Sequence, residues 1–157
     1  VVRLLLQNGA DVNQANSNGA SPLHVSSHHD HLNVVRVLLE NGAHVDHVTT
    51  NGCGCSALFL ASHEGNVAVC RLLLDNGADV DYANDGRTLL FFACQNGHLN
   101  TARFLLEYDA DVDRPNKDGV TPLHVASEEG SLDAVKLLIK YDATINQVDD
   151  DGNSPLY

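Results

Sequence analysis

A ten-residue block recurs five times along the chain, and its spacing constrains the fold more than any other feature of the sequence. The copies begin at residues 4, 37, 72, 104 and 137 and read LLLQNGADVN, VLLENGAHVD, LLLDNGADVD, FLLEYDADVD and LLIKYDATIN. A second block, SPLHVS from residue 21, returns in altered form from residues 56, 88, 121 and 154, and its leucines lie 35, 32, 33 and 33 residues apart. A period near 33 residues predicts a repeat architecture in which every repeat is one supersecondary unit.

Each period carries the signals of two short helices. Serine or threonine at positions 21, 56, 88 and 121 can cap a first helix, and the prolines at 22 and 122 suit its first turn, where a missing N–H costs nothing. The second helix has apolar residues at helical spacing and is predicted to end at a glycine in the left-handed conformation, at positions 9, 42 and 77. Asp109 and Asp142 replace that glycine in the last two copies, and aspartate tolerates the conformation less well.

A unit with two apolar faces must stack on its neighbours, so the pattern predicts an all-α solenoid of helix-turn-helix units with protruding turn or hairpin fingers. The chain resembles the ankyrin repeat family. Residues 121–146, TPLHVASEEGSLDAVKLLIKYDATIN, follow the family pattern of T-P-L-H-x-A, a glycine between the helices, a leucine run and a segment of the G-A-D-V-N type.

The resemblance covers the whole chain and implies a single ankyrin-repeat domain at residues 1–157. We expect a partial repeat at 1–17, full repeats at 18–50, 51–84, 85–117 and 118–150, and the start of a further repeat at 151–157. Both ends cut through repeats, so we expect a fragment of a longer array.

Several repeats depart from the family pattern. The middle repeats have Phe59 and Phe91 where the outer ones have the histidine of Pro-Leu-His, which in the family braces neighbouring turns, so they should depend more on apolar packing. Asp30 stands where later repeats have glycine, a local strain of about 1 kcal/mol. The turn at 47–56 is two residues longer than its counterparts and is a candidate specificity feature, whereas YANDGRT is one residue shorter.

Four histidines lie between residues 24 and 31, and the spacing of His24 and His28 is that of a zinc-binding helix. The repeat alignment explains His24 as the framework histidine and places His28 at the exposed end of a first helix. A zinc site made by His28 with His63, or with the Cys53-x-Cys55 pair, is the weaker alternative because adjacent helices lie about 8–10 Å apart. We expect neither a metal nor a cofactor.

Composition and motifs argue against several functions. The chain carries 21 acidic residues against nine Lys and Arg, so it should repel nucleic acid, and no apolar run approaches the ~18 residues that membrane insertion needs. Four cysteines in 157 residues do not form a secreted disulfide scaffold, which favours an intracellular protein, cytoplasmic or nuclear. There is no nucleophile elbow, phosphate-binding glycine loop or H-E-x-x-H motif, so we expect no enzymatic activity.

The resemblance implies a protein–protein interaction module or scaffold that binds a partner protein or peptide through its concave face and turn tips. By position, the implied contact set is Ser17, Asn18, Ala20, His28, His29, Cys53, Cys55, His63, Glu64, Asp85, Arg87, Gln95, Asn96, Lys117, Asp118, Val120, Glu128 and Glu129. The set becomes acidic toward its C-terminal end, so we expect a partner with a basic segment there.

Two alternative functions stay open, a substrate for hydroxylation and a structural spacer. Family members are hydroxylated at the asparagine of the DVN turn, which implies Asn13 and Asn146 as possible substrates here. The chain could instead be a spacer beside a catalytic or channel domain, and its uncapped ends could favour self-association. Five cations also form one column on the second helices, which we interpret as a solvated outer face, with an acidic partner as the alternative: Arg3, Arg36, Arg71, Arg103 and Lys136.

Overall fold

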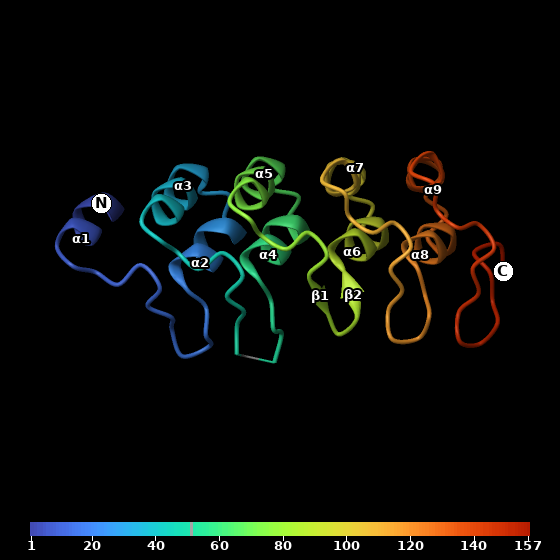
Figure 1. The fold of residues 1–157 in the computed structure, drawn as a ribbon, viewed down its shortest axis with the longest axis horizontal. Helices are drawn as coiled ribbons and strands as arrows, with labels where there is room; N and C mark the ends of the chain where they lie inside the picture. Colours follow the sequence, from blue (N-terminus) through green and yellow to red (C-terminus); the bar gives the residue numbers. More distant parts are fainter. Residues whose placement is uncertain (51) are drawn as a thin grey trace. The chain divides into compact units, whose positions relative to one another are not determined.

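The computed structural model describes residues 1–50 and 52–157, and these form helix pairs joined by protruding turns (Figure 1). The helices are α1 (Val2–Gln7), α2 (Pro22–His28), α3 (Leu32–Glu40), α4 (Ala57–His63), α5 (Val67–Asp75), α6 (Leu89–Gln95), α7 (Leu99–Glu107), α8 (Pro122–Glu128) and α9 (Leu132–Lys140). The strands are β1 (Ala83–Asn84) and β2 (Arg87–Thr88). Contacts divide the chain into unit 1, Val1–Asp79, and unit 2, Val80–Tyr157, and each unit is described by itself.

In unit 1 the first helices of the repeats, α2 and α4, pack side by side as an inner row, and the second helices, α3 and α5, pack as an outer row (Figure 1). The core lies between the rows, where Leu23, Leu38, Leu58 and Leu73 are at most 2% exposed. Burying a leucine side chain stabilises a fold by about 1.5–3 kcal/mol, so the two leucines that recur in each repeat contribute substantially to its stability.

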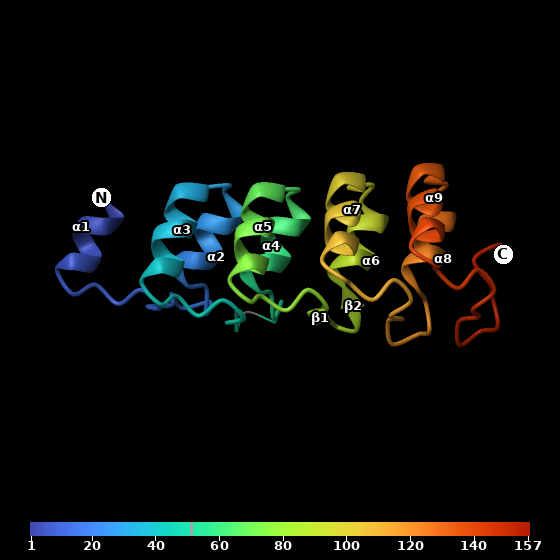
Figure 2. The same ribbon diagram turned by 45° about the horizontal axis from the view of Figure 1, so that its top comes forward.

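Unit 2 repeats this arrangement with α6 and α8 as its inner row and α7 and α9 as its outer row (Figure 2). Leu90, Leu105, Leu123 and Leu138 fill its core and are at most 2% exposed. Strands β1 and β2 form one finger as an antiparallel ribbon in which Ala83 pairs with Thr88 and Asn84 with Arg87. The all-α class with protruding fingers is therefore confirmed, whereas the repeat boundaries stay a prediction.

The helix starts follow the predicted capping chemistry. The side-chain oxygens of Ser56 and Thr88 accept the N–H groups of Phe59 and Phe91 at 3.1 and 3.2 Å. These bonds satisfy donors that the first turn of a helix leaves unpaired. The two phenylalanines are 8% and 5% exposed, which confirms that the middle repeats pack apolar rings where the outer repeats have histidine.

Four aspartates adopt the left-handed conformation. Asp30, Asp109 and Asp142 have φ of 55°, 61° and 64°, as their alignment with glycines predicted. Asp85, with φ of 53°, was not predicted; with Gly86 at 80° it forms the two-residue turn between β1 and β2. An Asp-Gly pair in this conformation is typical of a tight hairpin, and it explains how this finger can be one residue shorter than the others.

Cys70 and Cys94 are buried free thiols, as predicted, and burial raises their pKa to about 11 and about 12. A raised pKa leaves almost no thiolate at neutral pH, and the thiolate is the reactive form. We therefore expect the two thiols of the folded protein to resist iodoacetamide at pH 8 and to be alkylated at least about 100-fold faster in urea. Mass spectrometry of the alkylated cysteines checks this, and equal rates with and without urea would contradict it.

Candidate functional site

Two kinds of element bring the predicted contact residues to one face in each unit, which we call the inner face: the fingers and the C-terminal ends of the inner-row helices. Exposed or half-buried side chains are found for Ser17, Asn18, Ala20, His28, His29, Cys53, His63 and Glu64 in unit 1, and for Asp85, Arg87, Gln95, Asn96, Lys117, Asp118, Val120, Glu128 and Glu129 in unit 2. Cys55 is the exception, because it is only 1% exposed and cannot offer its side chain to a partner.

His24 holds the base of a finger in unit 1. Its Nδ1 accepts the backbone N–H of Ser21 at 3.2 Å, so the ring proton is on Nε2, which donates to the carbonyl oxygen of Cys55 at 3.1 Å. Burial lowers the pKa of His24 below its ordinary value, which keeps the ring neutral. His124 bonds in the same way to Thr121 and to the carbonyl of Asn153 in unit 2, so the framework role of both histidines is confirmed.

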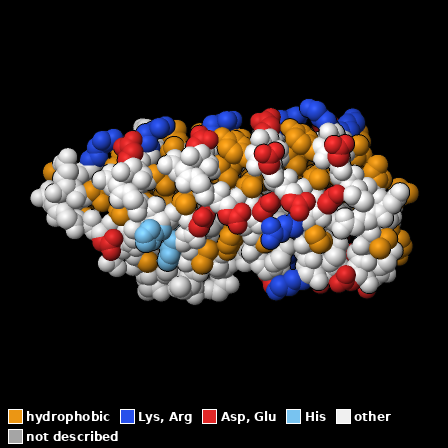
Figure 3. Space-filling view, in the orientation of Figure 1, with side chains coloured by type: hydrophobic (Ala, Val, Ile, Leu, Met, Phe, Trp, Pro, Cys, Tyr) orange, Lys and Arg blue, Asp and Glu red, His pale blue; other side chains and the backbone are white. Residues whose placement is uncertain are grey.

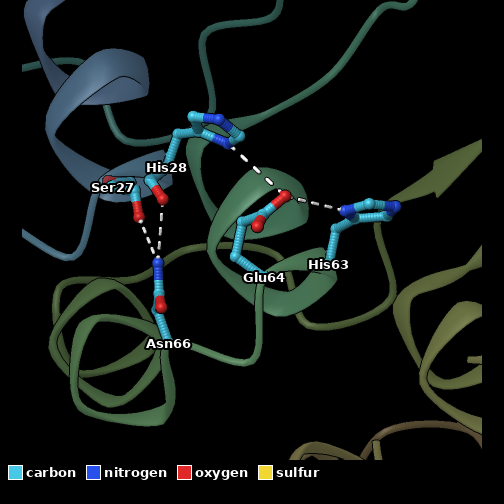
Figure 4. Close-up of polar contacts among 5 residues, drawn as sticks. All are labelled: Ser27, His28, His63, Glu64 and Asn66. Atoms are coloured by element: carbon cyan, nitrogen blue, oxygen red, sulfur yellow. Dashed lines mark hydrogen bonds and ion pairs between the residues drawn. The ribbon is translucent and has the colours of Figure 1, made fainter. Parts of the chain in front are cut away.

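A polar cluster joins neighbouring repeats on the inner face of unit 1 (Figure 4). Glu64 Oε1 lies 3.0 Å from His63 Nδ1 and 3.7 Å from His28 Nδ1. Below it, the Asn66 side-chain amide donates to the carbonyl oxygens of Ser27 and His28, each at 3.0 Å. The cluster thus brings together three residues of the predicted contact set and anchors the end of α2 to the turn between α4 and α5.

The described residues do not form the zinc site considered as an alternative from the sequence. Within residues 1–50 and 52–157, no three His, Cys, Asp or Glu side chains are placed to hold a metal ion. Cys53 and Cys55 are joined by a disulfide, which was not predicted. A disulfide has no thiolate to ligate zinc, so the pairing removes the sulfur ligands of that interpretation.

A hollow of about 220 Å³ lies on the inner face of unit 1. Its lining combines predicted contact residues, Ala20, His28, His29 and Cys53, with two apolar residues that the sequence reasoning missed, Val25 and Leu60. Val25 is 48% exposed although it is a valine within a helix. The repeat alignment could have identified both residues, because it places Val25 and Leu60 at the same position of α2 and α4. Each follows directly after the position of the framework histidine His24.

In unit 2 the fingers at Asp85 and Lys117 are joined by an ion pair between these two predicted contact residues. The hydrogen bond from Lys117 lowers the pKa of Asp85, so the carboxylate stays ionised and each charge partly neutralises the other. Beside them, the Arg87 guanidinium lies 5.8 Å from the centre of the Phe92 ring. The cations of this face are thus engaged, and the carboxylates of Glu128 and Glu129 stay exposed at the end of α8.

A larger hollow, about 570 Å³, lies between α8 and the last finger of unit 2. Its lining includes the carboxylates of Glu128 and Asp149, apolar surface from Val120 and Pro155, and the ring of Tyr157, and it contains no Lys or Arg. Hydrogen bonds from Asn153 lower the pKa of Asp149, so this carboxylate is ionised at neutral pH. The hollow can therefore receive a cationic side chain whose stem packs on the apolar surface.

Asn13 and the aspartates aligned with it in later repeats form hydrogen bonds between the turns of neighbouring repeats. Asn13 donates to the carbonyl of Gly42 and accepts the N–H of His44 at 2.8 Å. Aspartates at the matching positions, Asp46, Asp81 and Asp113, accept backbone N–H groups of the following turn. Asn146 is exposed, whereas the Asn13 amide is already engaged.

Among the described residues, no helix combines the length and the apolar character that crossing a bilayer requires.

Comparisons with known proteins agree with this geometry. No curated protein sequence matches the chain. A family model described as ankyrin repeats (3 copies) matches residues 1–49 and 44–116, and one described as ankyrin repeats (many copies) matches residues 105–156. Since these models together span nearly all of the sequence, the chain belongs to the ankyrin repeat family.

Proposed function

We propose that the chain is a non-catalytic scaffold that binds a partner protein or peptide through its inner face and finger tips. Ankyrin repeats are generally protein–protein interaction modules. The proposal is supported by contact residues that lie exposed beside a hollow in each unit while the framework histidines are buried. Binding pockets with apolar walls and a few polar groups are typical of recognition sites.

The partner of unit 2 carries a basic segment. The single observation behind this is the hollow beside α8, where Glu128 and Asp149 face the same space and no lining residue is a cation. Unit 2 also holds fourteen of the 21 acidic residues of the chain but only six of its nine Lys and Arg. A lysine or arginine side chain in this hollow would meet both carboxylates, and further basic residues would meet Glu129.

Charge reversal tests this function. We expect the Glu128→Lys, Glu129→Lys double variant to bind a fluorescein-labelled arginine-rich peptide about ten-fold or more weakly than the native chain, because two attractions become repulsions. Fluorescence anisotropy at low ionic strength measures the difference, since salt screens exposed charges.

A matched control separates the site from the overall charge. The Glu40→Lys, Glu107→Lys variant changes the net charge by the same amount, but its residues end the outer-row helices α3 and α7. It should weaken binding of the peptide by no more than about two-fold, which is the effect of the altered net charge alone. Equal losses in the two variants would overturn the inner face as the binding site.

The remaining expectations stay predictions. These are hydroxylation at Asn13 or Asn146, a spacer role beside another domain, self-association through exposed apolar residues such as Val1 and Leu5, and a cytoplasmic or nuclear location. The free thiols of Cys70 and Cys94 favour a reducing compartment, and the Cys53–Cys55 disulfide is the feature that weighs against one.

A further inference from the structure

The outer row of unit 2 contains a groove that the proposed function does not use. It runs between α7 and α9, which pack side by side, and its volume is about 380 Å³. Its lining consists of Leu99, Arg103, Asp133, Lys136, Leu137 and Lys140. Figure 3 shows Lys and Arg side chains gathered over α7 and α9, with apolar side chains beside them.

The groove is cationic in a strongly acidic chain. Three cations and one carboxylate line it, whereas the chain as a whole has a formal net charge of −12. The last residue of the outer-row helix explains the difference. It is acidic in the earlier repeats, at Glu40, Asp75 and Glu107, four residues after an arginine, and becomes Lys140 in α9. The charge that balances the arginine within the other helices is thus reversed in α9.

Within the described part of the chain, these cations form no salt bridge with a carboxylate. Within residues 1–50 and 52–157, neither Arg103 nor Lys136 forms an ion pair, and the Lys140 ammonium lies 5.7 Å from the centre of the Tyr141 ring. Lys136 and Lys140 lie four residues apart and so project from one side of α9. Three cations beside a single lining carboxylate, Asp133, leave the groove with a net positive charge, and an acidic ligand would relieve the repulsion among them.

Apolar surface beside the cations distinguishes between anionic ligands. Leu132 and Ile139 on α9 are 62% and 44% exposed, and helical spacing places them along the same stripe as Lys136. A phosphate group or a nucleic acid backbone gains nothing from such residues. A peptide that alternates carboxylates with apolar side chains complements both parts of the surface.

We propose that the α7–α9 groove is a second docking surface, separate from the inner face, and that its occupant is an acidic peptide segment with interspersed apolar residues. Carboxylates of the segment pair with Arg103, Lys136 and Lys140, and its apolar residues cover Leu99 and the exposed stripe of α9. The chain can then hold a basic partner on one face and an acidic partner on the other.

A fluorescein-labelled helical peptide of about 14 residues, with glutamates four apart and leucines between them, is the probe. Anisotropy with the whole chain should show binding that weakens at least about five-fold when glutamine replaces the glutamates, or when about 300 mM salt is added. The Lys136→Glu, Lys140→Glu variant should lose about ten-fold in affinity. Arg103→Glu, on the opposite wall of the groove, should lose affinity as well and gives an independent readout.

The control variant carries the same change of net charge away from the groove, as Arg36→Glu with Arg114→Glu, and should lose less than about two-fold. Circular dichroism confirms that each variant is folded. Equal losses in control and groove variants, or unchanged binding of the glutamine peptide, would overturn the proposal. Binding of phosphatidylserine vesicles without binding of the peptide would overturn it in favour of a lipid surface.

Discussion

Replacing His24 by alanine is expected to lower the free energy of unfolding by about 3 kcal/mol. The imidazole is 1% exposed, and its removal leaves the buried N–H of Ser21 without its acceptor, while the carbonyl of Cys55 keeps only the N–H of Thr49. A buried polar group that loses its partner costs about 1–3 kcal/mol, and the empty volume adds to this. Urea denaturation at pH 7.5 measures the change.

The His24→Phe variant is the matched control, because Phe59 and Phe91 fill the same position in the middle repeats. It restores the packing but not the hydrogen bonds, so we expect it to recover about half of the loss. If the alanine variant were within about 0.5 kcal/mol of the native chain, the bracing role of His24 would be wrong.

The same residue gives a pH dependence with a defined sign. Burial lowers the pKa of His24 below 6.5, so the folded chain favours the neutral ring and the unfolded chain takes up the proton first as the pH falls. The contribution of neutral His24 to the free energy of unfolding is complete above about pH 6.5 and is lost progressively below that pH. The gap between the native chain and His24→Phe should therefore be smaller at pH 5.5 than at pH 7.5.

The Gly119→Ala variant is expected to be less stable than the native chain by about 2–4 kcal/mol. Gly119 has φ of +78°, and an added Cβ would lie 2.9 Å from the backbone nitrogen and 2.9 Å from a carboxylate oxygen of Asp150 in the next finger. The left-handed conformation costs alanine about 1–2 kcal/mol, and displacing the next finger accounts for the rest. The displaced nitrogen is the one that donates to the carbonyl of Asp118 at 3.0 Å.

Gly130→Ala isolates the conformational contribution, and its difference from Gly119→Ala gives the contribution of the displaced finger. Gly130 also has a positive φ, +64°, but no atom lies within 4 Å of an added Cβ. We expect it to cost only about 1–2 kcal/mol, which corresponds to a few degrees in Tm for a chain of this size. Equal melting temperatures for the two variants would show that the fingers do not pack closely at Gly119.

Local chemistry explains which features the sequence could predict. Helix starts at Ser56 and Thr88 depend on a cap and its own first turn, and the positive φ of Asp109 depends on the end of one helix. Both are decided within a few residues, so the alignment of repeats was sufficient. The hairpin at Asp85 had an equally local signal, the Asp-Gly pair in a shortened turn, which was not used.

Contacts between repeats could not be predicted in this way. The approach of His28 to Glu64 and the pairing of Asp85 with Lys117 depend on the distance between neighbouring repeats and on side-chain rotamers. Cys55 is likewise buried where its carbonyl meets His24 of the preceding repeat, a contact between repeats. The periodic pattern therefore placed the candidate site on the right elements but did not determine which of its side chains pair with one another.

Besides the Asp85–Lys117 ion pair, main-chain atoms join neighbouring fingers. The carbonyls of Asn18 and Asp118 accept the N–H groups of Thr50 and Asp150, each at 3.0 Å, while the side chains of Asn18 and Asp118 are exposed. These two bonds thus do not depend on the side chains of Asn18 and Asp118, although Gly119 must stay glycine for the next finger to approach. The exposed side chains at the fingertips can therefore be replaced to suit a new binding partner while the backbone hydrogen bonds between the fingers are kept.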